Sequence, residues 1–114
     1  MQGKIQPGAR GISLIKGVEC GKNGMCLISQ IIKNYLSIDM CVLMGANIAT
    51  EVAMENFCES TIGYVNKENA SVFFSIFNTS YFRISLVEDV VGVELCGALK
   101  NVVAVAAGFT DGLK

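Results

Sequence analysis

The chain has 114 residues, 52% of them hydrophobic, which is enough apolar material for the core of one small domain and argues against disorder. Nine basic and ten acidic residues are interspersed, so no basic run favours nucleic acid or an anionic membrane as a partner. The five cysteines form no C-x-x-C pair and histidine is absent, which argues against a zinc site, a disulfide framework and histidine-activated nucleophiles. We therefore expect no metal, five cysteines buried as small hydrophobes, and a reducing, cytoplasmic setting.

The first elements expected along the chain are a strand and an amphipathic helix. Gly11 to Ile15 is a short apolar run that ends at Lys16-Gly17, which places a lysine at the carboxyl end of a strand. From Gly24 to Leu36 the apolar residues recur at helical spacing, which predicts one helix over the whole stretch.

Strands and helices are then expected to alternate. Met40 to Met44 is a compact apolar run stopped by Gly45, and the Asn47 side chain is placed to cap a helix that reaches about Phe57. The pattern next predicts a strand, a helix and a strand, at Ser60–Tyr64, Lys67–Phe77 and Phe82–Val87, with Val72, Phe73, Ile76 and Phe77 facing inward. Such alternation predicts an α/β fold whose sheet is at least partly parallel and is covered on both faces.

The longest apolar stretch, Val90 to Phe109, is about as long as a membrane span. Glu94, Lys100 and Asn101 lie inside it, and each charge near a bilayer centre costs roughly 3 kcal/mol on insertion scales. The stretch is therefore predicted to be the buried helix of a soluble protein. Its change of character after Glu88-Asp89 indicates that a second, helical region begins there.

One face of this helix carries small residues around Lys100 and Asn101, because Gly97, the Lys100-Asn101 pair, Ala104 and Gly108 succeed one another at steps of three or four. Two interpretations stay open: tight helix packing with Lys100 reaching solvent, or Lys100 held among apolar walls as a proton donor to a substrate oxygen.

Two other positions are equally ambiguous on pattern alone. Lys16 is either a solvated lysine or a ligand contact beyond a strand end. The turn Gly45-Ala46-Asn47 is either an ordinary turn or a source of N–H groups for an anion.

Five segments of the chain, in order, resemble eukaryotic cytosolic NAD-dependent glycerol-3-phosphate dehydrogenases and together cover nearly its whole length. They are Gly11-Ile12-Ser13-Leu14-Ile15-Lys16-Gly17, Val42-Leu43-Met44-Gly45-Ala46-Asn47-Ile48-Ala49, Phe57-Cys58-Glu59-Ser60-Thr61-Ile62-Gly63, Phe82-Arg83-Ile84, and Val93-Glu94-Leu95-Cys96-Gly97-Ala98-Leu99-Lys100-Asn101-Val102-Val103-Ala104-Val105.

The resemblance implies a fold and domain plan. Residues 1–89 would be the later βα units of a Rossmann-like NAD-binding domain. Residues 90–114 would begin an all-α substrate domain like that of 6-phosphogluconate dehydrogenase. The family also suggests a homodimer.

The resemblance also implies an activity and assigns residues to it. The reaction is reversible hydride transfer between NAD and the C2 carbon shared by sn-glycerol 3-phosphate and dihydroxyacetone phosphate. Lys100 would be the catalytic lysine that exchanges a proton with the C2 oxygen, and Asn101 would help to fix the substrate. Lys16 would contact the substrate and lie near the cofactor, and Ala49 would give NAD a main-chain contact.

Some of the family's parts are missing from this sequence. It has no G-x-G-x-x-G turn, and it lacks the later arginine and asparagine with which the family holds the substrate phosphate. We therefore expect an internal piece, interrupted before Met1 and after Lys114, that binds NAD weakly. The alternative is a non-catalytic short form that acts as an interaction or regulatory partner of full-length subunits.

Overall fold

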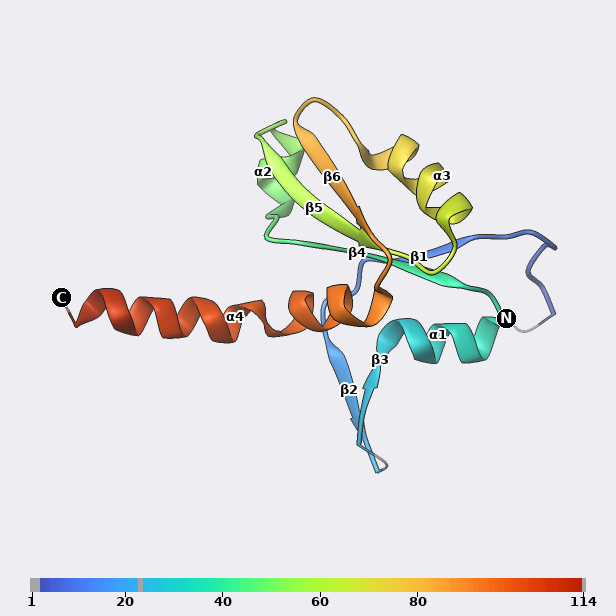
Figure 1. Cartoon of the computed structure of the whole chain (residues 1–114), viewed down its shortest axis with the longest axis horizontal. Coiled ribbons are helices and arrows are strands. Elements are labelled where there is room, and N and C mark those ends of the chain that lie inside the picture. Colours follow the sequence, from blue (N-terminus) through green and yellow to red (C-terminus); the bar gives the residue numbers. More distant parts are fainter. Residues whose placement is uncertain (1–2, 23, 114) are drawn as a thin grey trace.

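The computed structural model describes residues 3–22 and 24–113. The expectation of an internal piece concerns Met1 and Lys114, and both lie outside these residues. Within them a four-stranded sheet forms the centre of the molecule, in the order β1-β4-β5-β6 (Figure 1). These strands are β1 (Gly11–Ser13), β4 (Met40–Gly45), β5 (Cys58–Gly63) and β6 (Phe82–Val87).

The sheet is mixed, which agrees with the expectation of partly parallel strands. β1 pairs with β4 and β5 with β6 in parallel, whereas β4 and β5 are antiparallel, with Gly45 opposite Ser60. The carboxyl end of β4 therefore lies beside the amino ends of β5 and β6. The candidate site lies at this end of the sheet.

Helices cover both faces of the sheet, as the alternating pattern predicts (Figure 1). The two helices α2 (Ala49–Ala53) and α3 (Lys67–Phe77) lie on one side, and α1 (Ile28–Leu36) and α4 (Val90–Gly112) lie on the other. Successive side chains of a strand point to opposite faces, so each layer buries a different set. The α3 face buries the main core cluster, which consists of Cys41, Leu43, Ile62, Phe73 and Ile84.

The helix predicted for residues 24–36 is wrong in its first turn. Residues 24–27 form strand β3 (Gly24–Leu27), which pairs with β2 (Val18–Gly21) in an antiparallel hairpin that projects from the body (Figure 1). Gly24 has φ +109°, a backbone conformation that L side chains rarely adopt, and the hairpin begins its second strand there. The helix itself begins at Ile28.

The predicted cap at Asn47 is also wrong. Helix α2 starts only at Ala49, its N-cap residue is Ile48, and no side chain caps it; it ends at Ala53 and does not reach Phe57 as predicted. The Asn47 side chain instead donates a hydrogen bond to Ser60 Oγ on the neighbouring strand. A tertiary partner has replaced the local one, which sequence spacing cannot reveal.

Two burial expectations fail on the outer surfaces. Ile76 is 63% exposed, although its neighbours on α3 face inward as predicted. Cys20, Cys26 and Cys96 are exposed, because the hairpin and one side of α4 stand outside the layers.

The other two cysteines, Cys41 and Cys58, are buried as expected. Burial, and secondly the Asp39 carboxylate, raises the pKa of the Cys41 thiol above its ordinary value, so this thiol stays protonated at neutral pH.

Helix α4 is not the buried helix that its composition predicts. Only Glu94 and Gly97 are buried in it, and residues 101–113 are all exposed. Among the described residues it is the one helix long and apolar enough to cross a membrane by length and composition, two criteria that core helices of soluble proteins also meet. The pattern correctly predicts a helix but not what covers it.

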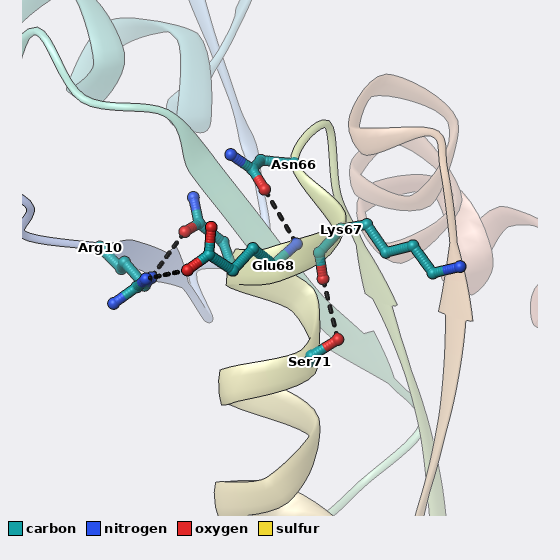
Figure 2. Close-up of polar contacts among 6 residues, drawn as sticks. Arg10, Asn66, Lys67, Glu68 and Ser71 are labelled. Atoms are coloured by element: carbon teal, nitrogen blue, oxygen red, sulfur yellow. Dashed lines mark hydrogen bonds and ion pairs between the residues drawn. The ribbon is translucent and has the colours of Figure 1, made fainter.

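The chain before β1 is tied to the start of α3 (Figure 2). Asn66 caps α3 by accepting a hydrogen bond from the Glu68 backbone N–H at 2.9 Å. Arg10 donates from Nε to Asn69 Oδ1 at 2.8 Å and from Nη2 to Glu68 Oε1 at 3.0 Å. The two Arg10 contacts join residues nearly sixty positions apart and tie the segment before β1 to helix α3.

Candidate functional site

Two hollows meet at Gly45, the last residue of β4. One, of about 440 Å³, lies beside α4 and is lined by Met44, Gly45 and Lys100 among others. The second, of about 560 Å³, lies beside α2 and α3 and is lined by Leu43, Gly45 and Lys16 among others. Leu43 and Met44 alternate along the strand, so the hollows open on opposite faces of the sheet and share one strand end.

Gly45 is hemmed in by its neighbours. A Cβ atom there would lie 2.6 Å from Glu59 O and 2.7 Å from Asn47 Nδ2, and would also collide with Ser60 Oγ. The hydrogen bond from the Asn47 side chain to Ser60 Oγ holds these two side chains beside Gly45. A side chain at position 45 would therefore displace the turn that separates the two hollows.

Lys100 points toward the sheet rather than into solvent. Its side chain is partly buried, and Nζ donates a hydrogen bond to the Gly45 carbonyl oxygen at 3.2 Å. Cys96, one helical turn earlier, lines the same hollow. The ammonium thus lies at the carboxyl end of β4, where a strand end and a helix wall meet.

Two glycines allow α4 to approach the sheet this closely. A Cβ atom on Gly97 would lie 2.6 Å from Met44 Sδ, and one on Gly63 would lie 3.0 Å from Val93 Cβ. The close approach brings the root of the Lys100 side chain to the strand end. The small-residue face therefore packs tightly, as one interpretation predicts, but Lys100 on it reaches the strand end and not the solvent.

Lys16 and Ala49 come together in the second hollow, whose walls are mostly apolar. Lys16 is exposed and follows β1 by three residues. Ala49 is the first residue of α2, so its backbone N–H has no intrahelical acceptor. Asn101 is exposed and lines neither hollow. Three of the four predicted site residues therefore adjoin the end of β4, from two faces.

The sequence does not reveal the role of Glu94. This carboxylate is fully buried and accepts hydrogen bonds from the backbone N–H of Ser29, at 3.0 Å, and from the Ser29 hydroxyl. A charge inside an apolar run was the only available signal, and it does not indicate a partner 65 positions away. No cluster of three or more His, Cys, Asp or Glu side chains that could hold a metal occurs in residues 3–22 and 24–113.

The chemistry available here follows from the arrangement of these groups. An ammonium beside an apolar hollow can stabilise negative charge on a substrate oxygen and can give that oxygen a proton. A largely apolar hollow with one cation at its margin suits a ligand with a flat ring and a polar end.

Comparison with known proteins decides the family. A family model described as the N-terminus of NAD-dependent glycerol-3-phosphate dehydrogenase matches residues 1–70, more than half of the chain. The chain belongs to the NAD-dependent glycerol-3-phosphate dehydrogenase family. The C-terminus model of the same family matches residues 89–114.

Relatives in this family match the whole chain. Glycerol-3-phosphate dehydrogenase [NAD(+)] of Cuphea lanceolata is 56% identical over 100% of this chain and 31% of its own length. A cytoplasmic enzyme of Pongo abelii is 55% identical over 99% of this chain and 32% of its own length, and a chloroplastic one of Arabidopsis thaliana is 54% identical over 100% and 29%. These relatives therefore come from more than one compartment.

The fold matches as well. A solved structure of Plasmodium falciparum glycerol-3-phosphate dehydrogenase superposes with a TM-score of 0.87 and 47% identity, over 96% of this chain and 31% of that one. The chain thus spans about a third of the length of the glycerol-3-phosphate dehydrogenases that it matches. The expected fold, a Rossmann-like part followed by a helix of the second domain, is confirmed.

Proposed function

We propose that this chain carries part of the active site of an NAD-dependent glycerol-3-phosphate dehydrogenase, which interconverts sn-glycerol 3-phosphate and dihydroxyacetone phosphate. The observation that carries the proposal is the Lys100 ammonium at the end of β4, 3.2 Å from the Gly45 carbonyl oxygen and at the margin of an apolar hollow. The reaction is inferred from the family, and the Lys100 ammonium is the proton donor that this reaction needs.

The second hollow suits the cofactor. Its volume of about 560 Å³ falls in the usual range for small-molecule sites, and its walls are apolar apart from a few polar groups. Lys16 offers a positive charge and Ala49 a free backbone N–H, both of which match an anionic dinucleotide. The residues present therefore fit NAD, and Lys16 and Ala49 would hold it.

NAD, when bound, accepts the hydride from the alcohol or, in its reduced form, gives it to the ketone. Lys100 acts on the oxygen. When hydride reaches the C2 carbon of the ketone, negative charge develops on the C2 oxygen, and the ammonium both stabilises that charge and donates its proton. In the other direction the neutral amine takes the hydroxyl proton. The Gly45 carbonyl orients Nζ for both directions.

The remaining roles rest on the resemblance. We propose that Lys16 also contacts the substrate and that Asn101 helps to fix it. We also propose a domain boundary between residues 89 and 90, which is supported by the end of β6 at Val87 and the start of α4 at Val90.

The setting of the protein is part of the same proposal. We propose a cytoplasmic protein without nucleic-acid or membrane partners, supported by the free cysteines and the balanced charge. A homodimer is proposed as well, since exposed valines on α4 offer apolar surface to another protein.

The test combines NAD titration with a turnover assay on the purified chain and its Lys100→Met variant. Wild type is expected to bind NAD weakly and to oxidise glycerol 3-phosphate slowly, because it lacks the G-x-G-x-x-G turn. Lys100→Met should bind NAD equally while this slow turnover falls about 10²- to 10⁴-fold, as for loss of a general acid or base. Lys67→Met, at an exposed lysine on α3, is the matched control and should keep full turnover.

Two results would contradict the proposal. Equal turnover in wild type and Lys100→Met would remove Lys100 from the reaction. NAD binding without turnover, together with mixed dimers formed with a full-length subunit, would favour the non-catalytic alternative.

A further inference from the structure

Glu94 is a buried carboxylate that no part of the proposed reaction uses. It is fully buried, its two oxygens accept the N–H and the O–H of Ser29, and it forms no ion pair within the part of the chain that the structure describes. A buried carboxylate is costly unless hydrogen bonds compensate it. The two hydrogen bonds from Ser29 supply this compensation.

The partner of Glu94 is the start of helix α1. The N-cap residue of α1 is Leu27, which makes no side-chain cap, and Ser29 lies in the first turn. The free N–H groups of a helix start attract negative charge, so Glu94 serves as the missing cap from a distant helix. The contact therefore joins α1 and α4 by two directional hydrogen bonds.

Three contacts along α4 fix its place on the sheet. Glu94, Gly97 and Lys100 follow one another at steps of three, which forms one ridge of the helix. Glu94 meets α1, Gly97 meets Met44 on β4, and Lys100 reaches Gly45, the next residue of that strand. Beyond Lys100 the helix is exposed to its end.

These contacts restrict the rotation of the helix in different ways. Gly97 acts only through packing against Met44, because it has no side chain that could form a directional bond. The Lys100 side chain is long and flexible and makes a single hydrogen bond at its tip. The Glu94 carboxylate, with two hydrogen bonds to one residue, defines both the angle and the position along the axis.

We propose that Glu94 is a positioning residue: by accepting both hydrogen bonds from Ser29 it fixes the rotation of α4 and so holds the Lys100 ammonium at the end of β4. Glu94 does not touch the substrate. Its effect on the reaction rests on the proposed function, whereas its effect on Lys100 does not.

The experiment reads Lys100 directly, by NMR of the chain labelled with ¹³C-lysine and without NAD or substrate. The Lys100 signal is assigned from its absence in Lys100→Arg, and the exposed Lys4 and Lys67 give the reference for a free ammonium. In wild type we expect inequivalent ε-methylene protons for Lys100. In Glu94→Leu, which keeps the site filled, the Lys100 signal should collapse onto the reference signals.

Two further variants separate positioning from simple packing. Glu94→Gln can still bond to both groups of Ser29 and should restore the Lys100 signal. Glu88→Gln removes the same charge from an exposed position just before α4 and should leave the signal unchanged.

An unchanged Lys100 signal in folded Glu94→Leu would overturn the proposal, as would an equal change in Glu88→Gln. If Glu94→Leu fails to fold, Ser29→Ala carries the test, because it removes only the hydroxyl partner; an unchanged signal there overturns the proposal too. If the Lys100 signal responds as expected but the chain does not turn over, the positioning role stands and the proposed function fails.

Discussion

At the scale of single residues, the site depends on positions where a side chain is absent. Gly45 lies in a cage of Ser60, Asn47 and the Glu59 carbonyl, and Gly97 lets Met44 lie against α4. The resemblance to a family flags both glycines, but only the structure says what each one makes room for. Gly97 controls how closely the Lys100 helix approaches β4.

Gly97→Ala is therefore expected to destabilise the chain. Its methyl group would lie 2.6 Å from Met44 Sδ, an overpacking that typically costs about 1–3 kcal/mol of unfolding free energy. Gly108→Ala, on the same helix with nothing within 4 Å, should stabilise by up to about 1 kcal/mol. Urea unfolding of the two variants measures both changes, and a loss of stability in Gly108→Ala equal to that in Gly97→Ala would contradict this account.

At the scale of elements, helices are held by different kinds of cap. Asn66 caps α3 and Asp89 caps α4, and each side chain accepts a hydrogen bond from a backbone N–H two or three residues later, so sequence spacing can reveal such caps. Glu94 caps α1 from a distant helix, so the local sequence cannot. A local cap sets the residue at which a helix begins, whereas a cap from a distant helix sets how the two helices pack together.

The start of α3 separates a capping effect from a surface ion pair (Figure 2). Asn66→Ala should lower the free energy of unfolding by about 1 kcal/mol, because the Glu68 N–H loses its acceptor. Arg10→Ala should cost less than about 1 kcal/mol, since the Arg10–Glu68 pair is exposed, and the cost should shrink further at high salt. Thermal unfolding at low and high salt distinguishes them, and Asn66→Ser, which keeps an acceptor, is the control. A salt-dependent loss in Asn66→Ala would contradict the assignment.

At the scale of the whole molecule, α4 projects from the body (Figure 1). The radius of gyration is 16.0 Å, whereas a compact chain of about 100 residues has roughly 13 Å. The projecting half carries exposed Val102, Val103, Val105 and Phe109. This exposed apolar surface is where we expect the contact of the proposed homodimer.

Val103→Glu should consequently reduce self-association without unfolding the chain. The side chain is 70% exposed, so a charge there meets no buried neighbour but opposes burial against another copy. Sedimentation across a range of concentrations should show the mass falling toward 12.2 kDa. Val65→Glu, at a valine 62% exposed and outside the projecting half of α4, should leave association unchanged. Equal association in wild type and Val103→Glu would place the contact elsewhere.

Most of the helices and strands, and the family, can be inferred from the amino-acid sequence alone. Apolar runs and helical spacing located β4, β6, α3 and α4 within a few residues, because burial imposes these periods on each segment separately. The segments around Lys16, Gly45 and Lys100 were sufficient for the resemblance that the comparisons confirm. The β2–β3 hairpin was not predicted, since Leu27 at the end of β3 also fits the helical spacing of the apolar residues that follow it in α1.

The tertiary structure alone decided what lies next to what. It placed Lys100 on the Gly45 carbonyl, put Lys16 and Ala49 on the other face of the same strand end, left Asn101 exposed, and buried Glu94 against Ser29. The physical reason is that periodicity reports which side of a segment is buried, whereas a hydrogen bond between distant residues depends on how whole elements pack. No local pattern carries that information.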